Sequence, residues 1–293
     1  MQHKVLYTSD IHGNETQYKK LVNYAIKIAA DTIIIGGDIA PNRRLEKNYI
    51  EFQRQFFEHG LPKLLYSLKE KLPSSKLFLM MSNDDCMTNL DVLEKQDPGL
   101  YKIIHGKRIN LTKEFDIIGY SYVPITPFGI KDWEKFDLSN VPLSLREEYE
   151  NRKRTNYRLN GFKSTKSGWK EFQFSPDMEK QDSIQKDLSD KLFQEKPNKT
   201  VYVIHTPPNQ TNLDQVLTKN HVGSISVRLF IENCQPYLTL HGHIHETVDV
   251  SGNFKDNIGK TLCLTSGNHN VGSKLAVLVF DLYHPEYADR IIL

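Results

Sequence analysis

The residues from Val5 to Gly13 read VLYTSDIHG, an apolar run that ends in a polar cluster. The run from Val5 to Thr8 is short and rich in residues that favour strands, so we predict a buried strand there. Asp10 and His12 follow it two residues apart, and in an extended chain alternate side chains point the same way. We therefore expect both side chains to face one site, where Gly13 lets the backbone approach a ligand closely.

The same pattern of a short apolar run with a polar end recurs along the chain. The further runs are Thr32 to Ile35, Leu77 to Met81, Ile117 to Val123, Val201 to Ile204, Tyr237 to Leu240, Leu262 to Thr265 and Leu275 to Phe280. Helix-like stretches lie between several of them, and Asn14 with Gln17 resembles a capping box that opens the first. Alternating strands and helices followed by a strand-rich part predict an α/β fold with a second sheet packed on the first.

Polar residues that can bind metals stand where these predicted strands end. Besides Asp10 and His12 they are Asp38, Asn83, His205, His243 and His245. Ligands in α/β folds gather beyond the carboxyl ends of the strands, so the fold would bring these residues to one place.

Taken singly, most of these residues have an ordinary explanation. Asp38 after two glycines suits a turn, Asn83 suits an Asx-turn, and a lone His205 suits a core or rim residue. The HGHIH cluster from His241 to His245 is harder to explain as packing, because imidazoles are common ligands of borderline metals. By alternation His241 shares the face of the other two, and we interpret it as a support for the ligands or as an acid near the substrate.

The ordered set Asp10-x-His12, Gly37-Asp38, Asn83, His205, Gly242-His243-x-His245 resembles the calcineurin-like metallophosphoesterase superfamily. The pattern of that family is D-x-H, G-D, G-N-H-D/E, H, G-H-x-H, and as an ordered set it is specific. The resemblance implies a four-layer α/β/β/α sandwich of two mixed sheets, with a two-metal site at its edge.

The resemblance also implies which residue binds which ion. Asp10, His12 and His245 would bind one metal, Asn83, His205 and His243 would bind the other, and Asp38 would bridge them. A mixed shell of oxygen and nitrogen suits two divalent ions such as Mn, Fe, Zn, Ni or Co, with manganese our working choice. Such a pair can hold a bridging hydroxide that attacks a phosphoester without a covalent intermediate on the protein.

Two positions depart from the family pattern. Ser82 stands where the family usually has Gly, which alters a turn without removing a ligand. Asp84 stands where many members have a His that stabilises the transferring phosphoryl group or protonates the leaving oxygen. An exposed Asp is normally ionised near neutral pH and is then a poor proton donor, so we expect slow reaction of esters with poor leaving groups unless a buried or anionic setting raises the pKa of Asp84. We still place Asp84, with Asp38, among the catalytic residues.

A second G-N-H sequence, Gly267-Asn268-His269, follows Gly242-His243-x-His245 instead of preceding it. We interpret Ser266 to Ser273 as the Asn- and Gly-rich turn that the family often has there. The histidines expected to be structural or on the surface are His3, His59, His105, His221 and His269.

From about Pro124 to Asn198 apolar runs become few, and charged and aromatic residues become frequent. We interpret residues 124–198 as an insertion or cap within a single metallophosphoesterase domain, residues 1–293. Between Asn151 and Lys170 it has seven basic residues and no acidic one. This stretch can grip a nucleotide-like ligand by charge and stacking, or be a solvated loop, and we favour the loop.

The composition excludes several classes of protein. With 39% hydrophobic and 25% charged residues, the chain is neither disordered nor fibrous. Lys and Arg total 38 against 36 Asp and Glu, so no general nucleic-acid surface is expected. Three scattered cysteines indicate a reducing compartment, and no apolar segment reaches membrane-spanning length, so we expect a cytoplasmic protein. Nothing in the sequence indicates an oligomeric state.

The first functional hypothesis is a metal-dependent phosphodiesterase that acts on a small or nucleotide-like phosphoester. The second is a phosphomonoesterase, protein phosphatases included. The third is a non-catalytic scaffold with the same fold, against which the presence of all seven ligand positions argues, since a binding surface would not need them.

Overall fold

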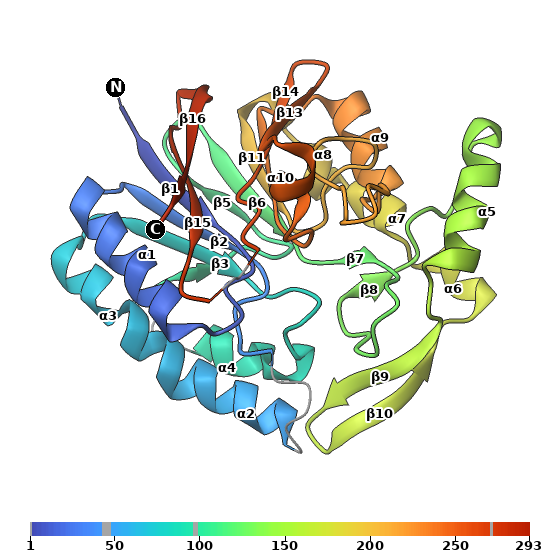
Figure 1. Cartoon of the computed structure of the whole chain (residues 1–293), viewed down its shortest axis with the longest axis horizontal. Coiled ribbons are helices and arrows are strands. Elements are labelled where there is room, and N and C mark those ends of the chain that lie inside the picture. The colour runs from blue at the N-terminus through green and yellow to red at the C-terminus, as the bar shows by residue number, and fades with distance from the viewer. Residues whose placement is uncertain (1, 43–47, 96–98, 270–271) are drawn as a thin grey trace.

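Two six-stranded sheets pack face to face in the computed structural model, which describes residues 2–42, 48–95, 99–269 and 272–293 (Figure 1). Sheet A has the order β16-β15-β1-β2-β3-β4. Its strands are β1 (Lys4–Thr8), β2 (Thr32–Gly36), β3 (Lys76–Met80), β4 (Lys102–Ile103), β15 (Ala276–Asp281) and β16 (His284–Ile292). The first four are parallel, and β15 and β16 run antiparallel at one edge, so the sheet is mixed.

Sheet B has the order β13-β14-β12-β11-β6-β5. Its strands are β5 (Arg108–Asn110), β6 (Asp116–Tyr120), β11 (Thr200–Ile204), β12 (Leu238–His241), β13 (Lys255–Ile258) and β14 (Thr261–Thr265). The central four are parallel and the two edge strands are antiparallel. The predicted strands are therefore present within one or two residues, except that the run from Ile117 to Val123 is divided between β6 and a short β7 (Val123–Pro124).

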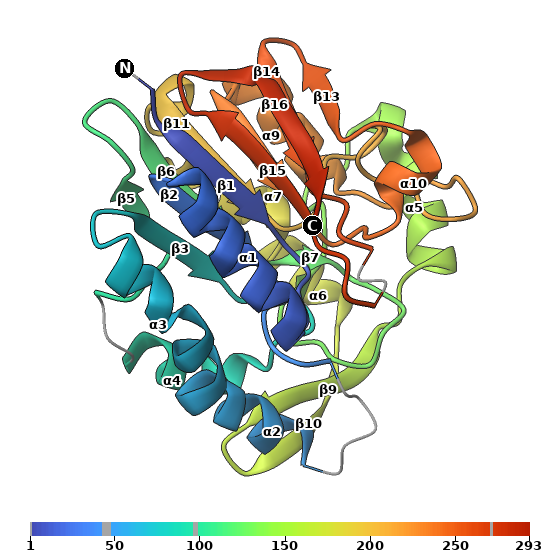
Figure 2. The same ribbon diagram turned by 60° about the vertical axis from the view of Figure 1, so that its left-hand side comes forward.

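Helices cover the outer face of each sheet (Figure 2). Helices α1 (Glu15–Ile28) and α3 (Leu61–Lys71) lie on sheet A, and α7 (Ile184–Leu188) and α9 (Ile225–Cys234) lie on sheet B. Three buried hydrophobic clusters separate the four layers: one under α1 and α3, one between the sheets, and one under α7 and α9. The predicted four-layer α/β/β/α sandwich of two mixed sheets is confirmed.

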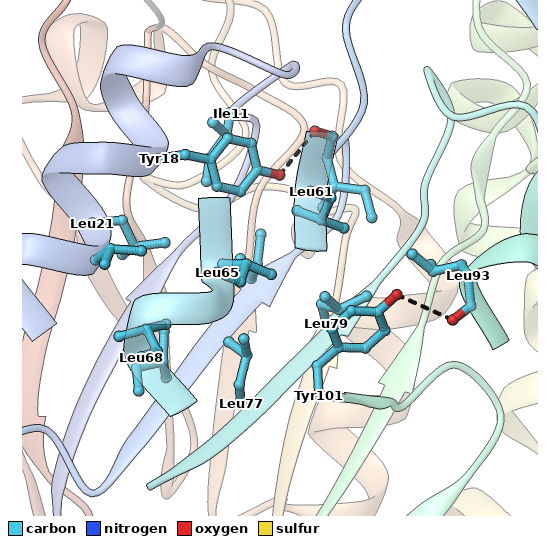
Figure 3. Close-up of a cluster of buried hydrophobic side chains, with 14 of the residues drawn as sticks. Ile11, Tyr18, Leu21, Leu61, Leu65, Leu68, Leu77, Leu79, Leu93 and Tyr101 are labelled. Carbon is cyan, nitrogen blue, oxygen red and sulfur yellow. Dashed lines mark hydrogen bonds between the residues drawn. The ribbon is translucent and has the colours of Figure 1, made fainter. Parts of the chain in front are cut away.

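The cluster under α1 and α3 combines apolar packing with satisfied tyrosine hydroxyls (Figure 3). Leu65 of α3 is fully buried there. Tyr18 donates its hydroxyl hydrogen to the carbonyl of Ile39 (2.9 Å), and Tyr101 donates to the carbonyl of Leu93 (3.1 Å). Because no buried hydroxyl is left unpaired in these two rings, they pack without the cost of an unsatisfied polar group.

Helix α1 begins at an Asn14 cap, as the sequence predicts. The Asn14 side chain accepts hydrogen bonds from the backbone N–H groups of Thr16 and Gln17. Gln17 does not complete a capping box, because its side chain contacts Lys274 and Asn268 and the Asn14 N–H bonds to the carbonyl of Ile11. The helix start is therefore tied to the loop before β15.

The remaining helices are short. They are α2 (Tyr49–Gln55), which continues through a π-helical turn (Phe56–Gly60) into α3, and α4 (Leu90–Lys95), α5 (Arg146–Thr155), α6 (Pro176–Gln181), α8 (Lys191–Gln194) and α10 (Thr247–Ser251). No helix of the described residues is long and apolar enough to cross a membrane.

Residues 124–198 form a group of small elements at one side of the two sheets (Figure 1). Strand β8 (Glu134–Lys135) pairs with β7, and β9 (Asn160–Thr165) and β10 (Gly168–Gln173) form a hairpin next to α5 and α6. The basic stretch from Asn151 to Lys170 therefore contains the end of α5 and most of the β9–β10 hairpin, and it is not an irregular loop. The last part of the segment, α7, packs on sheet B as part of the outer layer.

We predict that Leu65→Ala lowers the free energy of unfolding by about 2–5 kcal/mol, because it opens a cavity in a close-packed cluster. The neighbouring Tyr66 is 57% exposed, so Tyr66→Ala should change that free energy by less than about 0.5 kcal/mol. Urea unfolding of both variants measures the difference. Equal losses would show that the cluster under α3 does not hold the helix on the sheet.

His105 should make the protein less stable in acid. Burial lowers its pKa from 6.5 to about 4, and Nδ1 accepts the backbone N–H of Ser121 (3.1 Å). At a pH between these two values the unfolded chain binds a proton at His105 that the folded chain does not. The contribution of neutral His105 to the free energy of unfolding is therefore present above pH 6.5 and lost as the pH falls toward 4. We predict that, from about pH 7 to 5, the wild type loses about 2 kcal/mol more than His105→Asn, in which an amide oxygen replaces Nδ1. Parallel pH profiles of the two proteins would refute this.

Candidate metal centre

The loops that follow five parallel strands, three from sheet A and two from sheet B, meet at one edge of the sandwich. These loops follow β1, β2, β3, β11 and β12 and carry all of the predicted ligands: Asp10 and His12, Asp38, Asn83, His205, and His243 with His245. Because β1, β2 and β3 are parallel to one another in sheet A, as β11 and β12 are in sheet B, their carboxyl ends lie together within each sheet. The two sheets thus contribute to one polar cluster.

Four of these side chains form a tight group. Asp10, His12, Asp38 and His245 each offer one ligand atom, and these atoms lie within 4.8 Å of one another. His12 Nε2 is 3.3 Å from His245 Nε2, and His245 Nε2 is 3.4 Å from Asp10 Oδ1. This spacing is close enough for the four to share a single cation.

The other predicted ligands border the same group. His205 Nε2 lies 3.4 Å from Asp38 Oδ2 and 3.7 Å from Asp10 Oδ1. The rings of His205 and His243 have their centroids 5.4 Å apart. Asn83 and His243 line the same pocket as Asp38. The structure therefore brings all of the predicted positions together, with Asp38 between the two groups.

The backbone at four of these positions has a left-handed conformation. The φ angles are 57° at Asp10, 49° at His12, 51° at Asp38 and 68° at His243. The premise that the chain is extended at Asp10 and His12 is therefore wrong, since β1 ends at Thr8, although both side chains do reach the same group of ligand atoms. Residues other than Gly rarely adopt this conformation, and clusters of such residues are typical of functional sites.

His205 is oriented by a close approach of the backbone after β2. It donates Nδ1–H to the carbonyl of Gly36 (2.8 Å), which turns Nε2 toward the carboxylates. Gly37 has a φ of 109°, and a Cβ there would lie 2.5 Å from His205 Nδ1. A side chain at position 37 would displace the imidazole, so this Gly serves the site directly.

Imidazoles and carboxylates in the cluster shift one another's pKa. Burial opposes the ionisation of Asp38, but His205 holds the pKa of that carboxyl at about 2. Burial also opposes the imidazolium forms of His205 and His245, yet Asp38 and Asp10 respectively raise each pKa to about 9. Burial, assisted by His205, lowers the pKa of His243 to about 3. A bound cation would displace the protons of His205 and His245 and take over their positive charge.

The donor atoms fit a cation of borderline hardness. Two atoms of the candidate ligands, Asn83 Oδ1 and His205 Nε2, are buried and have no hydrogen-bond partner among the described residues. A buried polar atom without a partner costs free energy unless a ligand satisfies it. Imidazole nitrogens, carboxylate oxygens and an amide oxygen together suit Mn, Fe, Zn, Ni or Co.

Asp84 is buried, and both its backbone and its carboxylate form hydrogen bonds. Its backbone N–H donates to Asp38 Oδ1 (3.0 Å), and its carbonyl accepts from Tyr49 Oη (3.1 Å) and Gln53 Nε2 (2.8 Å). The amide of Asn42 donates to its carboxylate, which lies 3.7 Å from His12 Nδ1. Asp84 lines the same pocket as Asp38.

Asp85 is a residue of the site that sequence reasoning missed. Its buried carboxylate accepts the backbone N–H groups of Ile39 (3.1 Å), Ala40 (2.8 Å) and Ser82 (2.9 Å). It thereby joins the loops after β2 and β3, which carry Asp38 and Asn83. In the sequence it is one of two adjacent aspartates, and nothing there shows that Asp85 is the one that binds the backbone of these loops.

Asn268, within the second G-N-H sequence, is a support rather than a ligand. Its buried amide nitrogen donates to the carbonyls of Ser9 (3.2 Å) and Asp10 (3.0 Å), and its oxygen accepts from the N–H of Ala276 (3.2 Å). His269 instead contacts Asp249 (2.7 Å) near the surface. The predicted turn from Ser266 to Ser273 includes residues 270–271, which lie outside the described residues.

His241 is also a support. Nδ1 donates to the carbonyls of Ile204 (2.8 Å) and Thr206 (3.1 Å), and Nε2 pairs with Thr239 Oγ1 (2.8 Å). Burial lowers the pKa of this imidazole to about 4. With both nitrogens engaged, His241 joins the ends of β11 and β12 and is not placed to protonate a substrate.

Comparisons with known proteins agree with this geometry. The sequence profile of the calcineurin-like phosphoesterases matches residues 3–247. One solved structure superposes with a TM-score of 0.60 at 17% identity, covering 100% of this chain and 99% of the other. TT1561 of Thermus thermophilus (TM-score 0.54, 15% identity, 99% of each chain) and a dimetal phosphatase from Danio rerio (TM-score 0.50, 9% identity, 99% and 98%) are also similar. At these identities the structures show the fold alone. No curated protein has a significant sequence match.

We predict that Asn268→Ala weakens Mn²⁺ binding by about 10- to 100-fold, because it releases the backbone that carries Asp10. It should also lower the free energy of unfolding by about 1–3 kcal/mol. His269→Ala is the matched control, since this neighbour contacts only the exposed Asp249 among the described residues. Calorimetric Mn²⁺ titrations of both variants test the assignment, which fails if the two bind the ion equally well.

Proposed function

Since the chain belongs to the calcineurin-like phosphoesterase family, we propose that it is a phosphodiesterase that uses two divalent cations. Family membership supports metal-dependent hydrolysis of phosphoesters. The number of cations, the preference for diesters and a small or nucleotide-like substrate are the parts that we propose.

We assign Asp10, His12 and His245 to one cation and Asn83, His205 and His243 to the other, with Asp38 between them. The position of Asp38 supports this division, because one of its oxygens, Oδ2, lies near a ligand of each group: 3.4 Å from His205 Nε2 and 4.0 Å from His12 Nε2. When bound, the cations would supply Lewis acidity and an activated nucleophile at neutral pH. The similar fold of a dimetal phosphatase is consistent with the assignment.

The protein's own groups would position the phosphoryl group and restrain its surroundings. One oxygen of Asp38 accepts the Asp84 N–H, which fixes the orientation of the carboxylate before substrate arrives. Asn42, held by the Asp84 carboxylate, lines the pocket and presents a polar group without net charge. The Asp84 carboxylate stands where many relatives have an imidazole and accepts the Asn42 amide, so the leaving oxygen receives little help from an acid. We therefore propose that esters with good leaving groups react best.

The preference for diesters rests on one observation: hollows lie on both sides of the ligand cluster. A pocket of about 710 Å³ borders Asp38, Asn83 and His243, and a second of about 890 Å³ borders His12 and the start of α1. His245 lines both. A phosphodiester has two organic substituents, and a phosphate held at the cluster could direct one into each hollow. A monoester would leave one of them unused.

A scaffold role is less consistent with the site. The buried atoms Asn83 Oδ1 and His205 Nε2 lack hydrogen-bond partners among the described residues. A binding surface that never held a ligand here would bear their desolvation cost without compensation.

We predict that Asp38→Ala lowers kcat/KM for bis(4-nitrophenyl) phosphate in Mn²⁺ by about a thousandfold or more, since the loss of a ligand shared by two cations removes several kcal/mol of transition-state stabilisation. Asp177→Ala removes an exposed carboxylate of α6 and should leave the rate unchanged. Circular dichroism checks that both variants fold. Wild-type turnover by Asp38→Ala would refute the two-cation mechanism.

The same assay compares ester classes. We predict a higher kcat/KM for bis(4-nitrophenyl) phosphate than for 4-nitrophenyl phosphate, because the diester fills both hollows. The reverse order would favour a phosphomonoesterase. No turnover of either ester and no Mn²⁺ binding would favour the scaffold.

A further inference from the structure

The carboxylate of Asp84 contacts one candidate ligand from each of the two groups assigned above. Oδ1 accepts a long hydrogen bond from Asn83 Nδ2 (3.4 Å), and Oδ2 lies 3.7 Å from His12 Nδ1. Neither of these two nitrogens is the atom expected to bind a cation. Asp84 therefore meets both side chains at the end that a cation would leave unused.

The two ring nitrogens of His12 have different surroundings. Nε2 faces the ligand cluster, 3.3 Å from His245 Nε2 and 4.0 Å from Asp38 Oδ2. Nδ1 is buried and makes no hydrogen bond within the described ranges of the chain, and Asp84 is the carboxylate beside it. A neutral imidazole binds a cation only through the nitrogen that carries no proton. A carboxylate beside Nδ1 favours the proton there and so leaves the lone pair of Nε2 for the cation.

The amide of Asn83 also has two unlike ends. Nδ2 donates to Asp84, whereas Oδ1 is buried and, in the part of the chain that the structure describes, lacks a hydrogen-bond partner. The reverse orientation of the amide would place its oxygen against a carboxylate oxygen, so that two acceptors faced each other. Amide oxygens are the end of this side chain that binds divalent cations. Asp84 thus selects the orientation in which that oxygen stays available.

A carboxylate can serve several donors at once, which an imidazole cannot. Its two oxygens offer about four lone-pair sites. The Asn42 amide also donates to Oδ2, so Asn42, Asn83 and His12 together leave room for a further donor. The histidine that many family members have at this position could accept at most one hydrogen bond. The departure from the family pattern is therefore matched by the donors around Asp84.

The backbone of Asp84 holds the carboxylate in this place. Its N–H donates to Asp38 Oδ1 (3.0 Å), and its carbonyl accepts hydrogen bonds from Tyr49 Oη (3.1 Å) and Gln53 Nε2 (2.8 Å). These contacts involve no atom of the Asp84 side chain. A substitution at position 84 can thus remove the carboxylate and keep the backbone contacts that support the loop.

From these contacts we infer that Asp84 is a positioning residue, which fixes the tautomer of His12 and the amide orientation of Asn83 so that both present a free lone pair to a cation. The inference rests on the proposed function, because the cations belong to it. It goes further in giving Asp84 a role that acts through two ligands, in place of a direct contact with the substrate.

Cation binding tests this role without relying on turnover. Asp84→Asn keeps the shape of the side chain but replaces one acceptor oxygen by an NH₂ group, which is a donor. In calorimetric titrations we expect it to weaken Mn²⁺ binding by about 10- to 100-fold, as is usual when a ligand loses its supporting partner. Asp84→Ala, which adds no donor, should weaken binding in the same range.

Asp132→Asn is the matched control. The Asp132 carboxylate is also buried and accepts the backbone N–H groups of Met87 and Ser164 (both 2.8 Å), but it lines neither hollow beside the ligand cluster. The same exchange of carboxylate for amide at this position should leave the Mn²⁺ affinity unchanged. Circular dichroism checks that all three variants fold.

Nuclear magnetic resonance separates positioning from a general effect on the site. In the Zn²⁺-loaded protein with ¹⁵N-labelled histidines, we expect a downfield Nδ1–H resonance of His12, identified by its loss in His12→Gln. Asp84→Asn should shift this resonance upfield or broaden it by exchange with water. The Nδ1–H resonance of His205, which donates to the carbonyl of Gly36 (2.8 Å), should stay in place. An effect of Asp84 through the electrostatic field alone would leave the His12 resonance in place as well.

Three results would each overturn the positioning role: equal Mn²⁺ affinity of the wild type and Asp84→Asn, equal losses in Asp84→Asn and Asp132→Asn, or a His12 resonance that does not respond to Asp84→Asn. Mn²⁺ binding and a His12 resonance that both depend on Asp84, in a protein that hydrolyses no phosphodiester, would sustain the positioning role and refute the proposed phosphodiesterase. Diester hydrolysis with an Mn²⁺ affinity independent of Asp84 would do the reverse.

Discussion

Two carboxylates, Asp10 and Asp38, are only 1% exposed to solvent, and the structure around them depends on compensating their charge. A buried carboxylate costs several kcal/mol unless opposite charge or hydrogen bonds surround it. No single loop supplies enough positive charge and hydrogen-bond donors to surround both carboxylates. Imidazoles from sheet B and backbone N–H groups from both sheets have to converge, which requires the two sheets to pack with the ends of their parallel strands at the same edge.

Meeting this requirement reduces local stability. Left-handed backbone at residues other than Gly costs on the order of 1 kcal/mol or more each, and it occurs at Asp10 and Asp38 themselves. Buried polar residues hold those strained turns: Asp85 binds the backbone of two loops, and Asn268 binds the backbone of another. Burial of apolar side chains in the hydrophobic clusters between the layers contributes free energy of folding that offsets this strain.

The fold and the convergence of the candidate ligands were largely predictable because both depend on local pattern. Short β-branched runs mark buried parallel strands, and polar residues at their ends mark the edge where loops meet. The residues that support the loops of the site were not predictable from the sequence. Asn268 and Asp85 act on backbone groups that are distant in sequence, and residue type alone does not reveal such partners. The extended-chain argument for Asp10 and His12 failed because the strand ends before them.

Strands β6 and β11 are adjacent and parallel in sheet B, although residues 121–199 separate them in sequence. The chain therefore departs from the sheet and returns beside its point of departure. The entropy of closing such an excursion grows only slowly with its length. Evolution can thus lengthen, shorten or exchange α5, α6 and the β9–β10 hairpin without shifting the register that places His205. Chimeric proteins that exchange these elements would keep the strand register that places the candidate ligands.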